Sequence, residues 1–282
     1  MAEVDVYGYL ARLGLSDPGP PSVAGLRALH RAQVERVPYE NLDIQLGRVN
    51  SIDPVASFHR VVAGRSGYCF HCNGAFGLLL SALGYWVRWH RGGVQGREDP
   101  RPVGATGNHL VLTVHGLPDP GNPDGVWFVD AGLGDGLHEP LPLRPGGYRD
   151  GPFRFTLARS GVEPAGWRFG HDPVAGSFTG MDFRSEVAGI ADFQARHQWL
   201  STSPESGFVK VACVQRRDAT GADVLRGKVL TRVPGGAARE LTTAADWYGA
   251  LADIFGLVLP AEDRAPLWRR VSAAHDAWLA RR

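Results

Sequence analysis

Apolar side chains recur at helical spacing in three segments near the start of the chain. The segment 22–37 opens with Ser22, a residue type that caps helix N-termini, and its apolar positions then recur every three to five residues. The segment 53–64 opens with an aspartate followed by a proline, the usual order at a helix start, and ends in glycine. The segment 69–84 is apolar along most of its length and also ends in glycine. This pattern predicts three helices.

From Tyr85 onwards the hydrophobic period changes to two, which predicts strands separated by glycine- and proline-rich turns. Helical spacing returns near Thr243 and again over 267–279. Helices followed by strands and then by a mixed end favour an α+β fold over a doubly wound parallel sheet. The predicted strands are 86–90, 109–114, 126–129, 153–157, 208–214 and 225–233.

Composition and charge narrow the class of protein. The 282 residues are 44% hydrophobic and 21% charged, which excludes a mostly disordered chain. A formal net charge of +1 removes the electrostatic argument for a nucleic-acid partner. No apolar stretch reaches the ~20 residues that span a bilayer, and the acidic start of the chain lacks the layout of a signal peptide. Three cysteines do not make a disulfide framework, so we expect a cytoplasmic protein without a membrane partner.

One cysteine stands where a nucleophile would be activated. Cys69 begins a predicted helix, where the free backbone N–H groups and the helix dipole favour the thiolate. His109 opens the predicted strand 109–114, and Asp130 follows the predicted strand 126–129. If these strands are neighbours, their ends bring the histidine and the aspartate together beside Cys69, as a Cys-His-Asp site for nucleophilic catalysis requires. The alternative is that Cys69 is a small buried residue and His109 a hydrogen-bonded strand histidine.

The same stretch, Cys69-Phe70-His71-Cys72, also matches a Cys-x-x-Cys pattern, which indicates redox chemistry or a zinc site. Helices rather than a strand are predicted before it, and the chain has no second cysteine pair. Histidines elsewhere would have to complete a zinc site, and the candidates are His90, His109 and His115. We therefore keep a redox or zinc protein only as an alternative and expect no metal.

The remaining cysteine and histidines have simpler interpretations. Cys213 lies in the predicted strand 208–214 and is expected to be a small buried residue. The other histidines are expected at the surface or at helix caps: His30, His59, His138, His171, His197 and His275.

Five motifs, in order along the chain, resemble those of the arylamine N-acetyltransferase family. The segment 65–73 (Arg-Ser-Gly-Tyr-Cys-Phe-His-Cys-Asn) resembles the family's nucleophile motif Arg-Gly-Gly-x-Cys-Phe-Glu-x-Asn. The others are 37–43 (Val-Pro-Tyr-Glu-Asn-Leu-Asp), 108–110 (Asn-His-Leu), 129–134 (Val-Asp-Ala-Gly-Leu-Gly) and 199–208 (Trp-Leu-Ser-Thr-Ser-Pro-Glu-Ser-Gly-Phe). The ordered set is far more specific than any one motif.

The resemblance implies a fold in three parts, with the core that papain-like cysteine enzymes share. Residues 1–84 would form a helical bundle that carries the nucleophile. Residues 85–200 would form a central β-barrel that carries His109 and Asp130. Residues 201–282 would form an α/β lid and the C-terminal helices.

The resemblance also implies ping-pong acyl transfer, with Cys69, His109 and Asp130 as the catalytic residues. Cys69 would take the acetyl group from acetyl-CoA as a thioester, and an aromatic amine or hydrazine would then attack that thioester. Acetyl-CoA would be a co-substrate, with no bound cofactor, and the protein would be a monomer or homodimer. An alternative with the same triad is an amide synthase that closes macrolactams in natural-product biosynthesis.

Further residues take expected roles from the resemblance. The candidates for binding the acceptor are Tyr39, Val94, Leu133 and Phe208, each of which has core packing as its alternative. The candidates for contacting CoA are Thr106 and Gly134, and the candidates for supporting the site in an ionic and amide network are Arg65, Glu40 and Asn41.

The sequence departs from the family at several of these positions. His71 replaces the family's Glu, and it is interpreted as a structural stand-in, a rim residue that tunes the Cys69 thiolate, or a metal ligand. Leu133 and Tyr39 each replace a phenylalanine, and Ser66 replaces a glycine. Because two of these positions line the acceptor pocket in relatives, the identity of the acceptor stays open.

Overall fold

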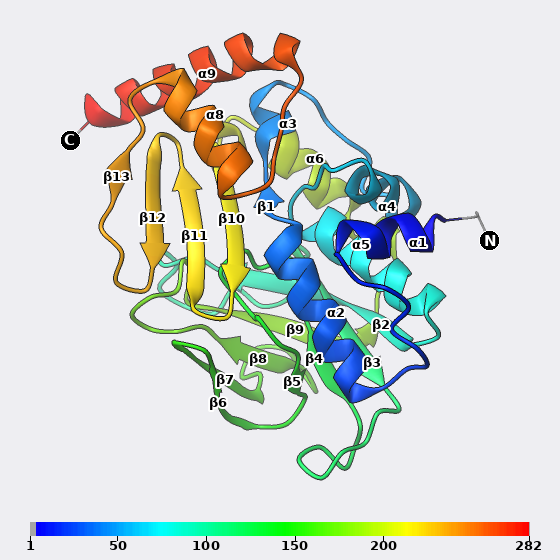
Figure 1. Ribbon diagram of the computed structural model, residues 1–282. Coiled ribbons are helices and arrows are strands. Elements are labelled where there is room, and N and C mark those ends of the chain that lie inside the picture. The colour runs from blue at the N-terminus through cyan, green and yellow to red at the C-terminus, as the bar shows by residue number, and fades with distance from the viewer. Residues whose placement is uncertain (1–3, 282) are drawn as a thin grey trace.

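The helices at the start of the chain form one layer of the computed structural model, which describes residues 4–281 (Figure 1). The predicted caps are confirmed: Ser22 Oγ accepts a hydrogen bond from the Gly25 amide at 3.1 Å, and Asp53 Oδ1 accepts from two amides of the next helix. Apolar side chains of this layer pack on the sheet below it. The helices are α1 (Val6–Arg12), α2 (Val23–Arg36), α3 (Leu42–Gln45), α4 (Pro54–Val62) and α5 (Cys69–Ala82).

The middle of the chain forms an eight-stranded antiparallel sheet that curves into a nearly closed barrel. Its strand order is β5-β4-β3-β2-β9-β8-β7-β6, and its interior is filled by aromatic and aliphatic side chains such as Phe128, Phe169 and Met181. The strands are β2 (Trp86–Gln95), β3 (His109–His115), β4 (Trp127–Val129), β5 (Leu141–Pro142), β6 (Gly146–Asp150), β7 (Phe153–Arg159), β8 (Trp167–Gly170) and β9 (Gly180–Val187). Helix α5 packs against β2 and β3.

The third part is a five-stranded sheet with two helices beside it, which we call the lid (Figure 1). Its core contains Trp247 and Leu251 from one helix and Leu267 from the other. The sheet order is β1-β10-β11-β12-β13. Its elements are β1 (Tyr39–Glu40), β10 (Cys213–Asp218), β11 (Gly221–Arg226), β12 (Val229–Val233), β13 (Arg239–Glu240), α8 (Ala244–Asp253) and α9 (Ala261–Leu279).

Short helices join the barrel to the lid: a 3₁₀ helix at Ile190–Phe193, α6 (Gln194–Thr202) and α7 (Gly207–Lys210). The prediction of an α+β fold with a helical layer, a barrel and an α/β lid is confirmed, whereas its boundaries at residues 84 and 200 stay predictions. Within residues 4–281, no helix is both long and apolar enough to cross a membrane.

The predicted strand 208–214 is wrong over residues 208–212. Ser206 Oγ accepts a hydrogen bond from the Phe208 amide at 3.1 Å and caps α7, so the strand β10 begins only at Cys213. The local cap therefore outweighs the β-propensity of the sequence that follows it. Tyr39 pairs with Gln215 in this sheet, a contact between distant segments that the periodicity did not predict.

Two further predictions about burial are wrong. Cys213 is half-buried rather than buried. Five of the six histidines expected at the surface or at caps are buried, because polar partners satisfy most of their ring nitrogens inside the protein. For example, His30 Nδ1 donates to the His138 carbonyl at 3.0 Å, and His138 Nε2 lies 2.6 Å from Glu35 Oε1. The buried five are His30, His138, His171, His197 and His275.

Candidate active site

Cys69 is the first residue of α5 and lines a cleft of ≈280 Å³. The helical hydrogen bonds begin with the amides of His71 and Cys72, which donate to the Tyr68 carbonyl, so the Cys69 amide lies ahead of them. Its Sγ lies 3.6 Å from the Asn108 carbonyl oxygen. The start of α5 thus brings the Cys69 thiol and free backbone N–H groups together.

Gly132 packs directly on this thiol. A Cβ at Gly132 would lie 2.8 Å from Cys69 Cα and 3.1 Å from Cys69 Cβ. Real Cβ atoms do not approach backbone atoms so closely, because the atoms would overlap. A glycine is therefore required where the loop after β4 crosses the start of α5.

His109 and Asp130 come together because β3 and β4 are antiparallel neighbours, as the sequence predicted. His109 Nε2 lies 2.7 Å from Asp130 Oδ2, which leaves Nδ1 for the Cys69 thiol. Burial alone would lower the pKa of His109. The negative charges of Asp130 and Cys69, and hydrogen bonds to both, outweigh burial and raise that pKa well above its ordinary value. The imidazole is thus built to hold a proton between a carboxylate and a sulfur.

Asn73 holds the carboxylate in place from one turn further along α5. Its Nδ2 donates to Asp130 Oδ1 at 2.8 Å, and its Oδ1 accepts from the Ala131 amide at 2.8 Å. The Gly132 amide donates to the same carboxylate oxygen at 2.9 Å. Because Cys69 and Asn73 stand four residues apart on one helix, α5 positions the thiol and the carboxylate together. Asn73 is part of the motif 65–73, but its hydrogen bond to Asp130 was not predicted from the sequence.

The four predicted acceptor-binding residues, Tyr39, Val94, Leu133 and Phe208, all line the cleft with Cys69 and His109. Tyr39 and Phe208 face each other edge to face with ring centroids 6.3 Å apart. Other lining residues were not identified from the sequence: one lies in the quoted motif 199–208, and the rest come from a loop and a lid strand with no local signal. They are Ser177, Phe178, Leu200 and Gln215.

The ionic network behind the start of α5 has different partners from those predicted. Arg65 Nη2 pairs with Asp43 Oδ1 at 3.1 Å rather than with Glu40. Arg60 Nη2 pairs with the same carboxylate at 2.8 Å and donates to the Ser66 carbonyl. Burial opposes a charge on Asp43, but the two guanidinium groups lower its pKa. The short helix α3 turns Asp43 toward both arginines. Asp43, rather than Glu40, is therefore their main partner.

Glu40 stays at the edge of this network, with its Oε1 3.9 Å from Arg60 Nη2, and Asn41 makes separate contacts. Glu40 Oε2 accepts from the Leu42 amide at 2.6 Å, and burial raises the pKa of this carboxyl. Asn41 Nδ2 donates to the Phe208 carbonyl at 3.0 Å, and its Oδ1 accepts from the Cys213 amide at 2.7 Å. Asn41 therefore joins the N-terminal layer to the lid segment that carries Phe208.

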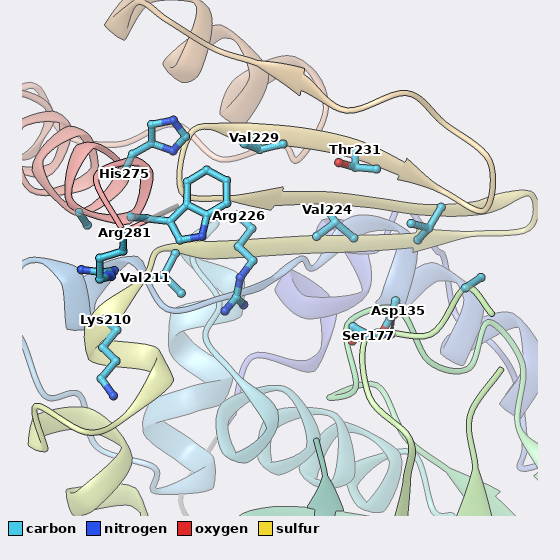
Figure 2. A pocket seen from close by; sticks show the side chains of 14 residues that line it. Asp135, Ser177, Lys210, Val211, Val224, Arg226, Val229, Thr231, His275 and Arg281 are labelled. Atoms are coloured by element: carbon cyan, nitrogen blue, oxygen red, sulfur yellow. Dashed lines mark hydrogen bonds between the residues drawn. The ribbon is translucent and has the colours of Figure 1, made fainter. Parts of the chain in front are cut away.

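A second cavity of ≈520 Å³ adjoins the cleft under the lid sheet, and Ser177 lines both (Figure 2). We call it the lid groove. Valine side chains of β11 and β12 form an apolar wall. Lys210, Arg226 and Arg281 gather toward one end, with Asp135 at the other (Figure 2). None of these three cations forms an ion pair with another residue in the described part of the chain, so the groove carries net positive charge.

Comparison with known proteins agrees with this geometry. A family model described as N-acetyltransferase matches residues 22–264 of the chain. The chain belongs to the arylamine N-acetyltransferase family. It is 31% identical to an arylamine N-acetyltransferase of Mycolicibacterium smegmatis over 272 residues, which cover 91% of this chain and 93% of that protein. The members of this family are acyltransferases.

Solved structures of the family superpose on nearly the whole chain. The arylamine N-acetyltransferase of Nocardia farcinica is 32% identical, with a TM-score of 0.82 and coverage of 95% of this chain and 94% of that one. The Mycobacterium marinum enzyme in complex with CoA is 26% identical, with a TM-score of 0.83 and coverage of 96% and 99%. The whole architecture, lid included, is therefore that of the family.

His71, where the family's motif has Glu, is buried and does not line the cleft. Its ring lies 4.8 Å from that of Tyr68 and 6.1 Å from that of His197. Burial, followed by the charges of Arg60 and His197, lowers the pKa of His71 to about 3, so its ring is neutral at pH 7. This placement contradicts the prediction of a rim residue. No group of three or more metal-binding side chains occurs in residues 4–281.

Cys72 and the two predicted CoA contacts lie outside the cleft and the lid groove. Cys72 Sγ donates to the Gly67 carbonyl at 3.3 Å, and burial raises the pKa of the thiol, so it stays protonated. Thr106 is exposed on the loop before β3. A Cβ at Gly134 would collide with the side chain of Gln215, so this glycine makes room for a residue that lines the cleft. Their contact with CoA stays a prediction.

Proposed function

We propose that this protein transfers the acetyl group of acetyl-CoA to an aromatic amine or hydrazine through a thioester on Cys69. The observation that carries the proposal is the convergence of Cys69, His109 and Asp130 at one side of a cleft lined by aromatic and aliphatic residues. This is the arrangement that nucleophilic acyl transfer requires. Membership of the arylamine N-acetyltransferase family supports it.

In the first half-reaction, His109 Nδ1 takes the proton of the Cys69 thiol, and the sulfur attacks the thioester carbonyl of acetyl-CoA. The tetrahedral intermediate then breaks its bond to the CoA sulfur, which leaves as a thiol after receiving the proton from His109. Backbone N–H groups at the start of α5 would stabilise the oxyanion. Asp130 fixes the imidazole through Nε2 and stabilises its protonated form.

In the second half-reaction, the amine attacks the carbonyl of the Cys69 thioester. His109 accepts a proton from the amine nitrogen and returns it to the cysteine sulfur as the product amide leaves. Tyr39, Val94, Leu133 and Phe208 would hold the aromatic ring of the acceptor. A thioester carbonyl is reactive enough for a weakly basic aromatic amine.

The lid groove supports CoA as the donor. The nucleotide end of acetyl-CoA carries several phosphate charges, and the groove offers Lys210, Arg226 and Arg281 without acidic partners among the described residues. Because Ser177 lines both cavities, a donor whose phosphates lie in the lid groove would reach the cleft past this residue. A related enzyme from Mycobacterium marinum has been solved with CoA.

The decisive test is the acyl-enzyme itself. Incubation with acetyl-CoA should give an adduct with the mass of one acetyl group, located on Cys69, and an aromatic amine should discharge it. Cys69→Ser should form no such thioester. Absence of the adduct and of CoA release from any short acyl-CoA would overturn the proposal and favour the amide-synthase alternative, in which a carrier-bound donor replaces acetyl-CoA.

A second test concerns the lid groove. Lys210→Gln combined with Arg226→Gln should raise the KM for acetyl-CoA about tenfold or more while kcat changes little. Acylation by p-nitrophenyl acetate, a donor without phosphates, should be unchanged in the same variant. An equal loss with both donors would place the CoA phosphates elsewhere.

A further inference from the structure

The pair of strands that carries His109 has a second end with a cavity of its own. In the register of β2 and β3, His109 lies opposite Gly92, whereas Trp86 lies opposite His115 at the far end. A cavity of ≈400 Å³ opens at this far end, where β2, β3, β8 and β9 meet the loops around β5. We call it the distal cavity. It shares no lining residue with the cleft or the lid groove.

Polar side chains occupy the barrel-facing side of the strands at this end. On β3, Val111 belongs to the barrel core, while Leu112 and Val114 pack toward the helices. Since side chains alternate along a strand, Thr113 and His115 share the inward face with Val111. Both line the distal cavity, above a floor that includes Trp167 and Phe183. The barrel interior is thus apolar in the middle and polar at this mouth.

The rim is strongly cationic, with four arginines and one aspartate. Arg184 pairs with Glu163 at 2.9 Å. The remaining three, Arg88, Arg144 and Arg159, form no ion pair with any residue from 4 to 281. The guanidinium of the half-buried Arg88 lies over the ring of Trp86 and makes no hydrogen bond within the described chain. Its donors are therefore available to a ligand.

A chain of hydrogen bonds fixes the protonation of the two histidines. His90 Nδ1 lies 3.1 Å from the Glu186 carbonyl, which can only accept, so this nitrogen carries the proton. His90 Nε2 then accepts from Thr113 Oγ1 at 2.8 Å, and Thr113 Oγ1 accepts from His115 Nε2 at 2.8 Å. In this neutral state only Nδ1 of His115 can take up a further proton.

We propose that the distal cavity is a second binding site, which takes a small organic anion with a carboxylate on an aromatic body. The unpaired guanidinium of Arg88 supplies the planar donors that a carboxylate requires, with Arg144 and Arg159 adding positive charge. Phe183 and Leu143 give the floor apolar surface that suits a ring, while the Arg159 guanidinium covers one face of Trp167 at 4.1 Å from the ring centroid. The volume lies in the range of small-molecule sites. The site does not depend on the acyltransfer proposed for Cys69.

The experiment uses the full chain with 2-naphthoate as the probe and calorimetry as the measurement. Cys69 is first alkylated with iodoacetamide, which blocks the catalytic thiol. We expect 2-naphthoate to bind the alkylated protein with unchanged affinity. The neutral 2-naphthamide should bind at least tenfold more weakly, and sulfate should compete only weakly, because neither combines the charge with the ring.

Two variants locate the site. Arg88→Gln should weaken 2-naphthoate binding tenfold or more, and the exposed Arg144→Gln provides a second, less disruptive change with a smaller loss in the same direction. Arg154→Gln is the matched control, since this arginine is exposed on β7 and does not line the cavity. Binding that is insensitive to both changes, or that disappears on alkylation of Cys69, would overturn the proposal.

The charge state of His115 gives an independent readout. Burial, then the charge of Arg88, lowers the pKa of His115. The other charged or titratable groups of the cavity are His90, Asp124, Arg144, Arg159 and Arg184. A bound carboxylate should raise the pKa of His115, measured from its ring NMR signals with and without 2-naphthoate. An unchanged pKa, or binding of sulfate as tight as that of 2-naphthoate, would leave only a non-specific anion patch and overturn the proposed class of ligand.

Discussion

The paired strands β2 and β3 hold two histidines in opposite electrostatic surroundings. At the catalytic end, His109 lies 2.7 Å from the Asp130 carboxylate and beside the Cys69 sulfur, and its pKa is raised. Facing the distal cavity from β2, His90 bonds a carbonyl and a threonine hydroxyl near Arg88, and burial together with nearby positive charge lowers its pKa to about 4. Both rings are buried, so burial alone does not decide their charge.

The difference lies in the partners. A buried imidazole stays neutral unless an anion compensates the cost of burying its charge. Asp130 supplies that anion at the catalytic end, and it is itself held by Asn73 and the Gly132 amide. His90 bonds the Glu186 carbonyl and the Thr113 hydroxyl near Arg88, and within the described residues no carboxylate bonds its ring, although Asp124 also lines the distal cavity. The catalytic site therefore has its own carboxylate partner for the imidazole. The distal cavity gains such a partner only when an anionic ligand binds.

Asp130→Asn should have the largest effect. An amide removes the negative charge and reverses a hydrogen bond, so the pKa of His109 should fall and acylation of Cys69 should slow roughly 10³- to 10⁴-fold. The measurement is the single-turnover rate of CoA release. Asp276→Asn, an exposed carboxylate on α9, is the control and should leave the rate unchanged. A loss of less than tenfold would mean that the catalytic end needs no buried anion.

Gly132→Ala should have the next largest effect. The added methyl group would lie 2.8 Å from Cys69 Cα, so the loop after β4 or the start of α5 must shift. Displacement of the thiol from His109 by even a fraction of an ångström should lower kcat/KM about a hundredfold, with the protein still folded. Gly161→Ala, where a methyl group meets open space, is the matched control. Wild-type activity in Gly132→Ala would show that the site tolerates movement of its nucleophile.

The pKa values of His109 and His90 are shifted in opposite directions, so the two residues should make the free energy of unfolding change in opposite directions with pH. His109, with a raised pKa, stabilises the fold most fully below the unfolded pKa of about 6.5 and loses this contribution as pH rises through its folded value. His90, with a lowered pKa, contributes above about 6.5 and loses that contribution as pH falls toward 4. His71 acts in the same sense as His90.

His90→Gln tests the acid side of this difference. Urea unfolding of the wild type between pH 7.5 and 5 should include a loss of about 2 kcal/mol from His90, which the variant should lack. The exposed His59→Gln should keep the wild-type slope. If His90→Gln also keeps that slope, His90 is not held neutral by the distal cavity, and the contrast between the two ends fails there.

The sequence was sufficient where chemistry coincided with the start or end of an element. Cys69 begins a helix, His109 begins a strand and Asp130 follows one, so pairing of two strands was enough to place them together. Ion-pair partners that depend on side-chain direction could not be predicted from the sequence. Arg65 pairs with Asp43 rather than Glu40, and only the turn of α3 decides between the two carboxylates.

Contacts between distant segments were equally hidden. The cations of the lid groove come from α7, β11 and the end of the chain, and no local pattern links them. Five of the histidines expected at the surface are buried, and the sequence could not show this because acceptors such as the His138 carbonyl lie more than a hundred residues away. A periodic pattern predicts which face of an element is buried. The polar partner of a buried histidine ring depends instead on how the helical layer, the barrel and the lid pack against one another.

Cys72→Ala should have the smallest effect on activity and decides between the two interpretations of Cys69-Phe70-His71-Cys72. The Cys72 thiol donates to the Gly67 carbonyl and burial keeps it protonated, so it offers no thiolate to the cleft. Acetyl transfer should stay within about twofold of wild type, with a loss of about 1 kcal/mol in the free energy of unfolding from the missing sulfur. Cys213→Ala, at a half-buried strand position, is the control for removal of a thiol. Acetyl transfer could instead be lost in Cys72→Ala and kept in Cys213→Ala, with Cys69 still alkylated at the normal rate. That result would mean that Cys69 and Cys72 act as a pair. The catalytic site would then need a second sulfur as well as its buried carboxylate.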